Sequence, residues 1–91
     1  MTAYTIHLDQ AESADDLHDI LKEILPLPHH YGRNLDALFD ILTEPSTDWN
    51  IRFTGTDTAE ARLGSYIRKL QKMCQRATAE NEALEILFIN S

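Results

Sequence analysis

Two aspartates, Asp36 and Asp40, lie one helical turn apart in the segment LDALFDIL, and Glu44 follows four residues later. Residues four apart share a face of a helix, where like charges destabilise an isolated helix by a few tenths of a kcal/mol. Aspartate is also unfavourable inside a helix, because its side chain competes for backbone hydrogen bonds. Carboxylates gathered on one face in spite of this cost indicate a surface that binds a cationic partner.

The same pair of carboxylates has two other interpretations. The spacing alone favours ordinary solvated acids on an exposed helix. A carboxylate pair can also hydrolyse glycosidic bonds, but a convex helix face lacks the cleft that shifts the pKa values of catalytic acids. The sequence contains no Ser–His–Asp order, glycine-rich phosphate loop or Walker-type motif. We therefore expect no enzymatic activity.

His29, His30 and Cys74 are the other residues whose types could bind a ligand. Adjacent histidines in an extended loop point in different directions, and no third ligand has the spacing of a metal site. Cys74 lies on the apolar stripe of a predicted helix, which favours a buried small hydrophobic residue over a nucleophile. We expect neither a metal nor a cofactor.

The elements that must position the acids follow from apolar periodicity. Alternation of apolar and polar residues predicts strands over 4–8 and 49–53, and five apolar residues in six predict a well-buried strand over 84–89. Helical periodicity predicts helices from Ser13 to Pro26, from Asn34 to about Thr43, from Thr58 to Leu63, and between Gly64 and Asn81.

Short polar residues and prolines set the predicted boundaries around the acidic helix. Ser13 and Asn34 are suitable N-caps, and Pro26 ends the first helix because the residue before a proline is driven from the helical conformation. Pro28 keeps the next loop extended. Gly32 is expected to supply a backbone conformation that other residues resist.

The order strand, helix, helix, strand, helix, helix, strand predicts an α/β fold. Strands joined by helical crossovers run parallel, so we expect a three-stranded parallel sheet packed with about four helices. A length of 91 residues fits one domain over 1–91.

Composition is that of an ordinary soluble globule, with 43% hydrophobic and 25% charged residues. No apolar run approaches the roughly 20 residues of a membrane helix, so we expect no membrane partner. The N-terminus has no basic and apolar stretch of the signal-peptide kind. A single cysteine fits a reducing compartment. These features predict a cytoplasmic protein.

The net charge of −7 is unevenly distributed. Residues 1–61 hold 12 acidic and 3 basic residues, whereas residues 62–91 hold 3 acidic and 5 basic residues. An acidic surface repels phosphates, which argues against a nucleic-acid ligand. It attracts a basic protein and accelerates the encounter, although acidity can also serve solubility alone.

Residues 27–42, LPHHYGRNLDALFDIL, resemble the barstar family of intracellular ribonuclease inhibitors. The family pattern is Leu-Pro-x-x-Tyr-Gly-x-Asn-Leu-Asp-Ala-Leu-aromatic-Asp-x-Leu. Outside this segment the resemblance is a matching length and order of elements, and it implies the same three-stranded α/β fold. The matching residues are Leu27, Pro28, Tyr31, Gly32, Asn34, Leu35, Asp36, Ala37, Leu38, Phe39, Asp40 and Leu42.

The resemblance implies inhibition of a basic ribonuclease, in an immunity or antitoxin role. In the family, the aspartates that match Asp36 and Asp40 enter the enzyme's active site and take the places of RNA phosphates, meeting its cationic side chains. Asp40 is then the central anchor, and the chain is expected to be a monomer before it forms the complex. The alternative is a module of the same fold that binds a basic protein other than a ribonuclease, such as another class of toxin.

The resemblance also implies which residues surround the two anchors, and several of them depart from the family. His30 replaces a tyrosine, Phe39 a tryptophan, Arg33 an acid, and Arg76 a glutamate of the last helix. A reversed charge at a contact penalises the usual partner, so a distinct but related enzyme is expected. Tyr31, Gly32 and Asn34 could instead only shape the loop, and Thr43 could only end the helix. The implied partner-binding residues are His30, Tyr31, Gly32, Asn34, Asp36, Phe39, Asp40, Thr43, Arg76 and Glu80.

Overall fold

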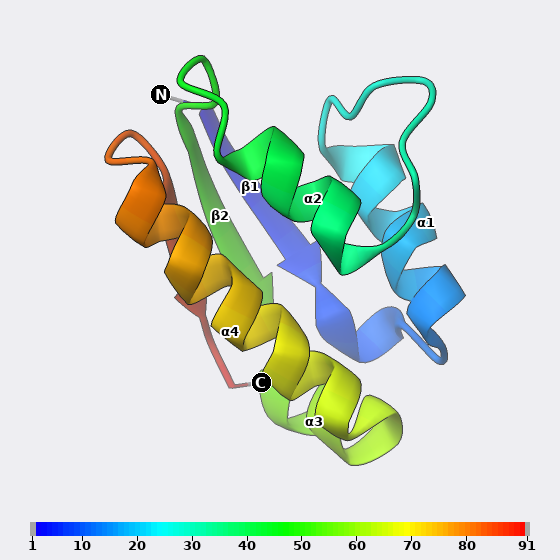
Figure 1. Cartoon of the computed structure of the whole chain (residues 1–91). Helices are drawn as coiled ribbons and strands as arrows, with labels where there is room; N and C mark the ends of the chain where they lie inside the picture. Colours follow the sequence, from blue (N-terminus) through cyan, green and yellow to red (C-terminus); the bar gives the residue numbers. More distant parts are fainter. Residues whose placement is uncertain (1, 91) are drawn as a thin grey trace.

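A parallel β-sheet forms the base of the fold (Figure 1). The computed structural model describes residues 2–90, and within them the sheet has three strands in the order β1-β2-β3. Both neighbouring pairs are parallel, and Phe53 of the central strand lies opposite Ile6 and Phe88. The predicted α/β class with a parallel sheet is confirmed. The strands are β1 (Thr2–His7), β2 (Trp49–Thr54) and β3 (Glu85–Phe88).

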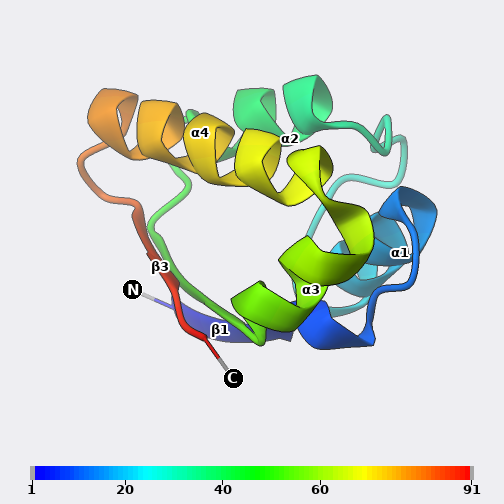
Figure 2. The same ribbon diagram turned by 90° about the horizontal axis from the view of Figure 1, so that it is seen from below.

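The helices lie together on one side of this sheet (Figure 2). Side chains of the strands show which face they cover, because Ile6, Ile51 and Phe53 are buried whereas Thr5 and Arg52 are exposed. None of the described helices is long and apolar enough to cross a membrane. In order they are the 3-10 helix η1 (Leu8–Gln10), α1 (Ala14–Ile24), α2 (Leu35–Leu42), α3 (Thr56–Leu63) and α4 (Ser65–Glu80).

The last strand is shorter and more exposed than the sequence predicted. It spans Glu85–Phe88 rather than 84–89, and its residues alternate between exposed and partly buried. β3 lies at an edge of the sheet, and the outer face of the sheet has no helix over it, so alternate side chains reach solvent. Leu87 is 53% exposed, the one exposed large hydrophobic residue among residues 2–90. The expectation of a well-buried strand was wrong.

The end of β1 and the start of α3 also differ from the prediction. Leu8 does not extend β1 but begins η1, where its side chain is fully buried. α3 begins at Thr56, two residues before the predicted start, with Gly55 as its N-cap. Gly55 has φ 68°, and a Cβ at this position would lie 2.6 Å from the Cβ of Asp9. Glycine is therefore required both for the left-handed conformation and for the close approach.

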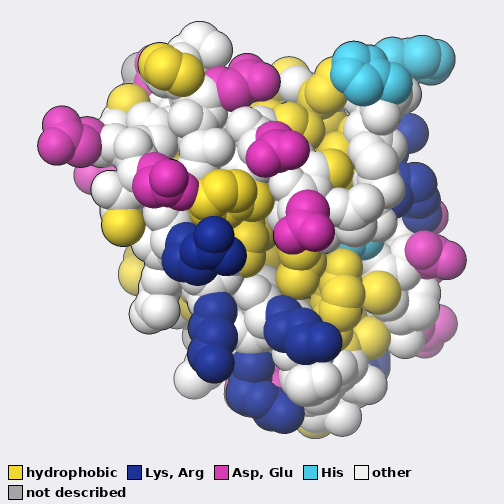
Figure 3. Space-filling view, in the orientation of Figure 1, with side chains coloured by type: hydrophobic (Ala, Val, Ile, Leu, Met, Phe, Trp, Pro, Cys, Tyr) yellow, Lys and Arg dark blue, Asp and Glu magenta, His cyan; other side chains and the backbone are white. Residues whose placement is uncertain are grey.

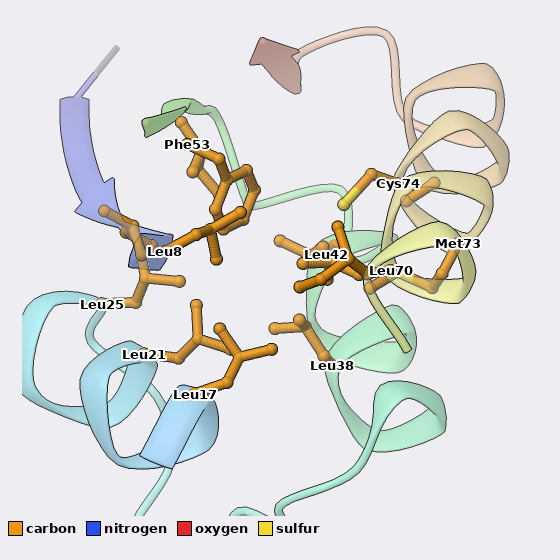
Figure 4. Close-up of a cluster of buried hydrophobic side chains, with 14 of the residues drawn as sticks. Leu8, Leu17, Leu21, Leu25, Leu38, Leu42, Phe53, Leu70, Met73 and Cys74 are labelled. Carbon is orange, nitrogen blue, oxygen red and sulfur yellow. The ribbon is translucent and has the colours of Figure 1, made fainter. Parts of the chain in front are cut away.

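A core of leucines holds α1, α2 and α4 onto the sheet (Figure 4). Leu17 and Leu21 of α1 are fully buried, and Leu38 and Leu42 of α2 are each 1% exposed. Each pair is spaced by four residues, so each helix directs one stripe inward. Burying one leucine side chain contributes roughly 1.5–3 kcal/mol. This core fixes the rotation of α2 about its axis.

Candidate partner-binding surface

The orientation of α2 presents its carboxylates to solvent. Leu38 and Leu42 face the core, and residues two positions away from a buried leucine lie on the far side of a helix. Asp36 and Asp40 are accordingly exposed, and Glu44, in the turn after the C-cap Thr43, is exposed as well. We call these three residues the acidic stripe. Within residues 2–90 no ion pair or side-chain hydrogen bond engages their carboxylates.

Asn34 joins the preceding loop to the start of α2, as predicted for an N-cap. Its Oδ1 accepts a hydrogen bond from the backbone N–H of Ala37 at 2.7 Å, and its Nδ2 donates to the carbonyl of Gly32 at 3.1 Å. The expected special conformation at Gly32 was wrong, because the positive φ of 56° belongs to Arg33. Gly32 instead allows the backbone to pass close to Ala37, because a Cβ added at Gly32 would lie 3.3 Å from the Cβ of Ala37.

Arg33 directs its charge toward α1. Its Nη1 lies 2.5 Å from Asp19 Oδ1, and its Nη2 donates to the backbone carbonyl of Asp15 at 3.1 Å. The hydrogen bond to Asp19 raises the pKa of the guanidinium. In the sequence, Arg33 differs from the family pattern, but nothing there indicates its partner. The structure shows that it fastens the loop of residues 28–34, which we call the binding loop, to α1.

Tyr31 is buried and belongs to a network that sequence analysis did not detect. Its side chain is 6% exposed, and its hydroxyl lies 2.7 Å from Nδ1 of His18. The Nε2 of the same imidazole lies 2.6 Å from the hydroxyl of Tyr66 in α4. Burial raises the pKa of Tyr31 and lowers the pKa of His18. The network connects the binding loop to both α1 and α4.

The His18 network makes stability depend on pH. The pKa of His18 in the folded chain lies below its usual 6.5, because burial and the nearby Arg33 disfavour the imidazolium more than Asp15 and Asp19 favour it. The unfolded chain therefore binds more protons below pH 6.5, and the free energy of unfolding falls as pH decreases from 6.5 through the folded pKa.

Urea unfolding at pH 7.5, 6.5 and 5.5 measures this effect, with His18→Gln as the comparison. We expect the wild type to lose stability across the series and the variant, which cannot take up that proton, to change less. Parallel pH profiles for the two proteins would show that His18 is not the titrating group.

The remaining predicted site residues lie around the acidic stripe and at the ends of α2 and α4. His30 and Glu80 are exposed. Phe39 is partly buried, and the guanidinium of Arg76 lies 4.8 Å from the centre of its ring. Thr43 is the C-cap of α2, and its hydroxyl donates to the carbonyl of Phe39 at 2.8 Å.

The binding loop and α2 together form a shallow hollow. It has a volume of about 250 Å³ and brings His30 next to two members of the acidic stripe, Asp40 and Glu44. Figure 3 shows acidic side chains over α2 and His side chains at the adjoining loop. No group of three or more His, Cys, Asp or Glu residues within 2–90 is arranged to hold a metal ion. The hollow has the chemistry of a site for a cationic side chain.

The clamp between Arg33 and α1 is expected to matter more for binding than for folding. Arg33→Ala removes the bonds to Asp15 and Asp19 but keeps a side chain at positive φ, whereas Arg33→Gly removes the bonds and tolerates that φ. Both variants should release a bound protein partner faster, because the binding loop is no longer held in one conformation. Of the two, Arg33→Gly should have the higher free energy of unfolding. The checks are dissociation rates and urea midpoints. Unchanged dissociation in both variants would contradict a positioning role.

Comparison with known proteins supplies a family and a relative. Residues 1–89 match the family model described as Barstar (barnase inhibitor). YrdF of Bacillus subtilis (strain 168), a protein provisionally named as a ribonuclease inhibitor, is 37% identical over 70 residues. That alignment covers 76% of this chain and 77% of YrdF.

Proposed function

Because the chain belongs to the barstar family, a family of inhibitors rather than enzymes, we propose that it blocks the active site of a basic ribonuclease. Asp40 and Asp36 occupy the positions of RNA phosphates in this complex. Asp40 is the central anchor and Asp36 the second.

The observation that carries this proposal is that the acidic stripe has no ion-pair partner within the described residues 2–90. Asp36 and Asp40 lie on a helix whose rotation is fixed by buried leucines, and no described residue neutralises them. Carboxylates held in this way bind arginine and lysine with little loss of side-chain freedom, and charge-assisted hydrogen bonds in a dried interface are strong. A cationic active site that normally grips phosphates is the complementary surface.

The binding loop surrounds the anchors and limits the choice of enzyme. His30 borders the hollow beside Asp40, and the backbone from Tyr31 to Asn34 is held by the His18 network and by the cap. We place the chain in the cytoplasm as a monomer that protects a cell from the nuclease as an immunity protein or antitoxin. A buried, unpaired Cys74 is compatible with that compartment.

A basic partner other than a ribonuclease is the second candidate. His30, Phe39 and Arg76 all differ from the family at positions around Asp36 and Asp40. These surrounding residues are therefore the part of the surface that would fit a partner other than the usual one. Capture of partners on the immobilised chain, with an Asp40→Ala chain as control, separates the two. Ribonuclease activity retained only by the wild-type chain supports inhibition of a nuclease. A captured basic protein without that activity supports the second candidate.

Association of the complex is expected to slow strongly as salt increases. An acidic face attracts a basic enzyme over long range, and the Debye length falls from about 30 Å at 0.01 M to a few ångströms near 0.5 M. Dissociation should change much less, because the buried contacts are hardly screened. Stopped-flow mixing of chain and ribonuclease between these salt concentrations gives both rates. An association rate independent of salt would indicate an apolar interface.

A further inference from the structure

A second charged stripe, of the opposite sign, lies on α4. Arg68, Lys72 and Arg76 follow one another at intervals of four residues and are all exposed. We call them the basic stripe. Their spacing places all three on one face of α4, as the spacing of Asp36 and Asp40 does on α2. This region is positive although the net charge of the whole chain is −7.

The two stripes adjoin each other on one face of the molecule. α2 and α4 pack together in the helical layer (Figures 1 and 2). In Figure 3, a group of Lys and Arg side chains over α4 lies next to the acidic side chains over α2. The guanidinium of Arg76 contacts the ring of Phe39, which stands in α2 between Asp36 and Asp40 in sequence. This cation–π contact holds one positive charge at the boundary between the stripes.

The stripes do not neutralise each other across that boundary. Within residues 2–90, no ion pair joins α2 to α4, and neither Lys72 nor Arg76 has a carboxylate partner. Arg68 alone is paired, with Glu60 at 3.6 Å. Like charges four residues apart weaken a helix, so the pair Asp36 and Asp40 in α2 and the basic stripe in α4 each oppose folding slightly. The face retains a negative region over α2 and a positive region on α4, which ends at Arg76 because the next residue of the series, Glu80, is an exposed acid.

A uniformly basic partner would be attracted by one half of this face and repelled by the other. We infer that the basic stripe is the second half of the interface, and that the target ribonuclease carries an acidic patch beside its basic active site. This inference rests on the proposed function, because the acidic stripe must already be seated in the enzyme. Complementary charges on both halves would fix the register of docking and exclude uniformly basic relatives.

Two other occupants of the basic stripe are less consistent with its surroundings. A nucleic acid would bring phosphates beside Asp36 and Asp40, which repel them. A second copy of the chain is complementary by charge, since an acidic stripe could meet a basic one. Exposed ion pairs of that kind contribute little each, and such a dimer would cover the inhibitory face. We therefore assign the stripe to the enzyme, and self-association becomes an outcome of the test.

The test uses a panel of purified basic ribonucleases, barnase among them, with the whole chain. The variant Lys72→Glu/Arg76→Glu reverses the stripe, and Arg52→Glu makes the same type of change on the opposite, exposed face of the sheet. For the enzyme that the wild type binds most tightly, we expect at least a tenfold loss of affinity in the double variant and less than a twofold change in Arg52→Glu. Arg76→Gln, which only removes a charge, should give a smaller loss. Arg76→Gln also tests the inference if the double variant does not fold.

Three results would overturn the inference. An affinity within twofold of the wild type, or a tighter complex, in the double variant would place the stripe outside the interface or opposite cations. A wild-type dimer in sedimentation, abolished by the double variant while enzyme binding is unchanged, would assign the stripe to a second copy. If no ribonuclease of the panel binds, the proposed function fails as well. If a ribonuclease binds through Asp40 and its affinity does not depend on the basic stripe, this inference fails and the proposed function stands.

Discussion

Replacing Asp40 with alanine is expected to stabilise the free chain. Asp40 is exposed, has no ion pair within residues 2–90, and lies one turn from Asp36. The substitution removes a like-charge repulsion of roughly 0.2–0.5 kcal/mol. It also removes an unfavourable helix propensity of up to roughly 0.7 kcal/mol. The free energy of unfolding should therefore increase by about 0.5–1 kcal/mol.

The same substitution is expected to weaken the complex severely. Removing the anchor leaves the enzyme's cationic groups in a dried, unpaired pocket, so we expect a loss of at least ~2 kcal/mol of binding free energy. Barnase and barstar are among the complexes from which such losses of binding free energy are known, so the figure is carried over from the family. Urea unfolding of the free variant and titration of its complex measure the two effects. Glu23→Ala, which removes an exposed acid of α1, is the control and should leave binding unchanged.

A residue that lowers the stability of the free chain and is needed for the complex has a role in binding. If Asp40→Ala destabilised the free chain and left partner binding intact, Asp40 would be a structural residue. The assignment of the anchor would then be wrong, whatever the identity of the partner.

Replacing Asn81 with alanine is expected to produce the opposite pattern. Asn81 is 6% exposed, and its Nδ2 lies within 3.1 Å of the backbone carbonyls of Leu42, Glu44 and Thr47. The amide thereby fastens the turn after α2 to the end of α4. Truncation leaves the buried carbonyls of Leu42 and Thr47 without this donor, which should lower the free energy of unfolding by roughly 2–3 kcal/mol.

Binding of the enzyme should change little in Asn81→Ala, because the folded variant keeps Asp36 and Asp40 in place. Thr78→Ala is the matched control, since that hydroxyl donates to the carbonyl of Gln75 in its own helix. Denaturant titration beside binding measurements gives both quantities. A stability loss no larger than that of Thr78→Ala would mean that the turn is held by other contacts.

Local patterns in the sequence predicted the elements that carry the acids. Asn34 caps α2 through its side chain, the leucine stripe faces the core, and the helix ends at Leu42 with Thr43 as its C-cap. Ser13 likewise caps α1 as expected, accepting from the N–H of Asp16. These features depend on residues within four positions of one another, so a single segment specifies them.

Contacts between distant residues were beyond prediction from one sequence. Arg33 and Asp19 are separated by 14 residues, His18 and Tyr66 by 48, and Asn81 and Leu42 by 39. A polar residue that meets its partner across the fold leaves no periodic signal along the chain. The exposure of β3 was missed for a similar reason, because five apolar residues in six do not show whether the strand lies at the centre or the edge of the sheet. Only the assembled sheet places it at the edge.

The most direct test of the central claim is the inhibition of purified basic ribonucleases, barnase included, by the free chain. Initial rates of RNA cleavage are measured at several concentrations of RNA and of the chain. If carboxylates take the places of phosphates, at least one enzyme should be inhibited with 1:1 stoichiometry, competitively with RNA, and the inhibition should be lost in Asp40→Ala. Absence of inhibition across the panel, or inhibition that is not competitive and persists in Asp40→Ala, would contradict the account.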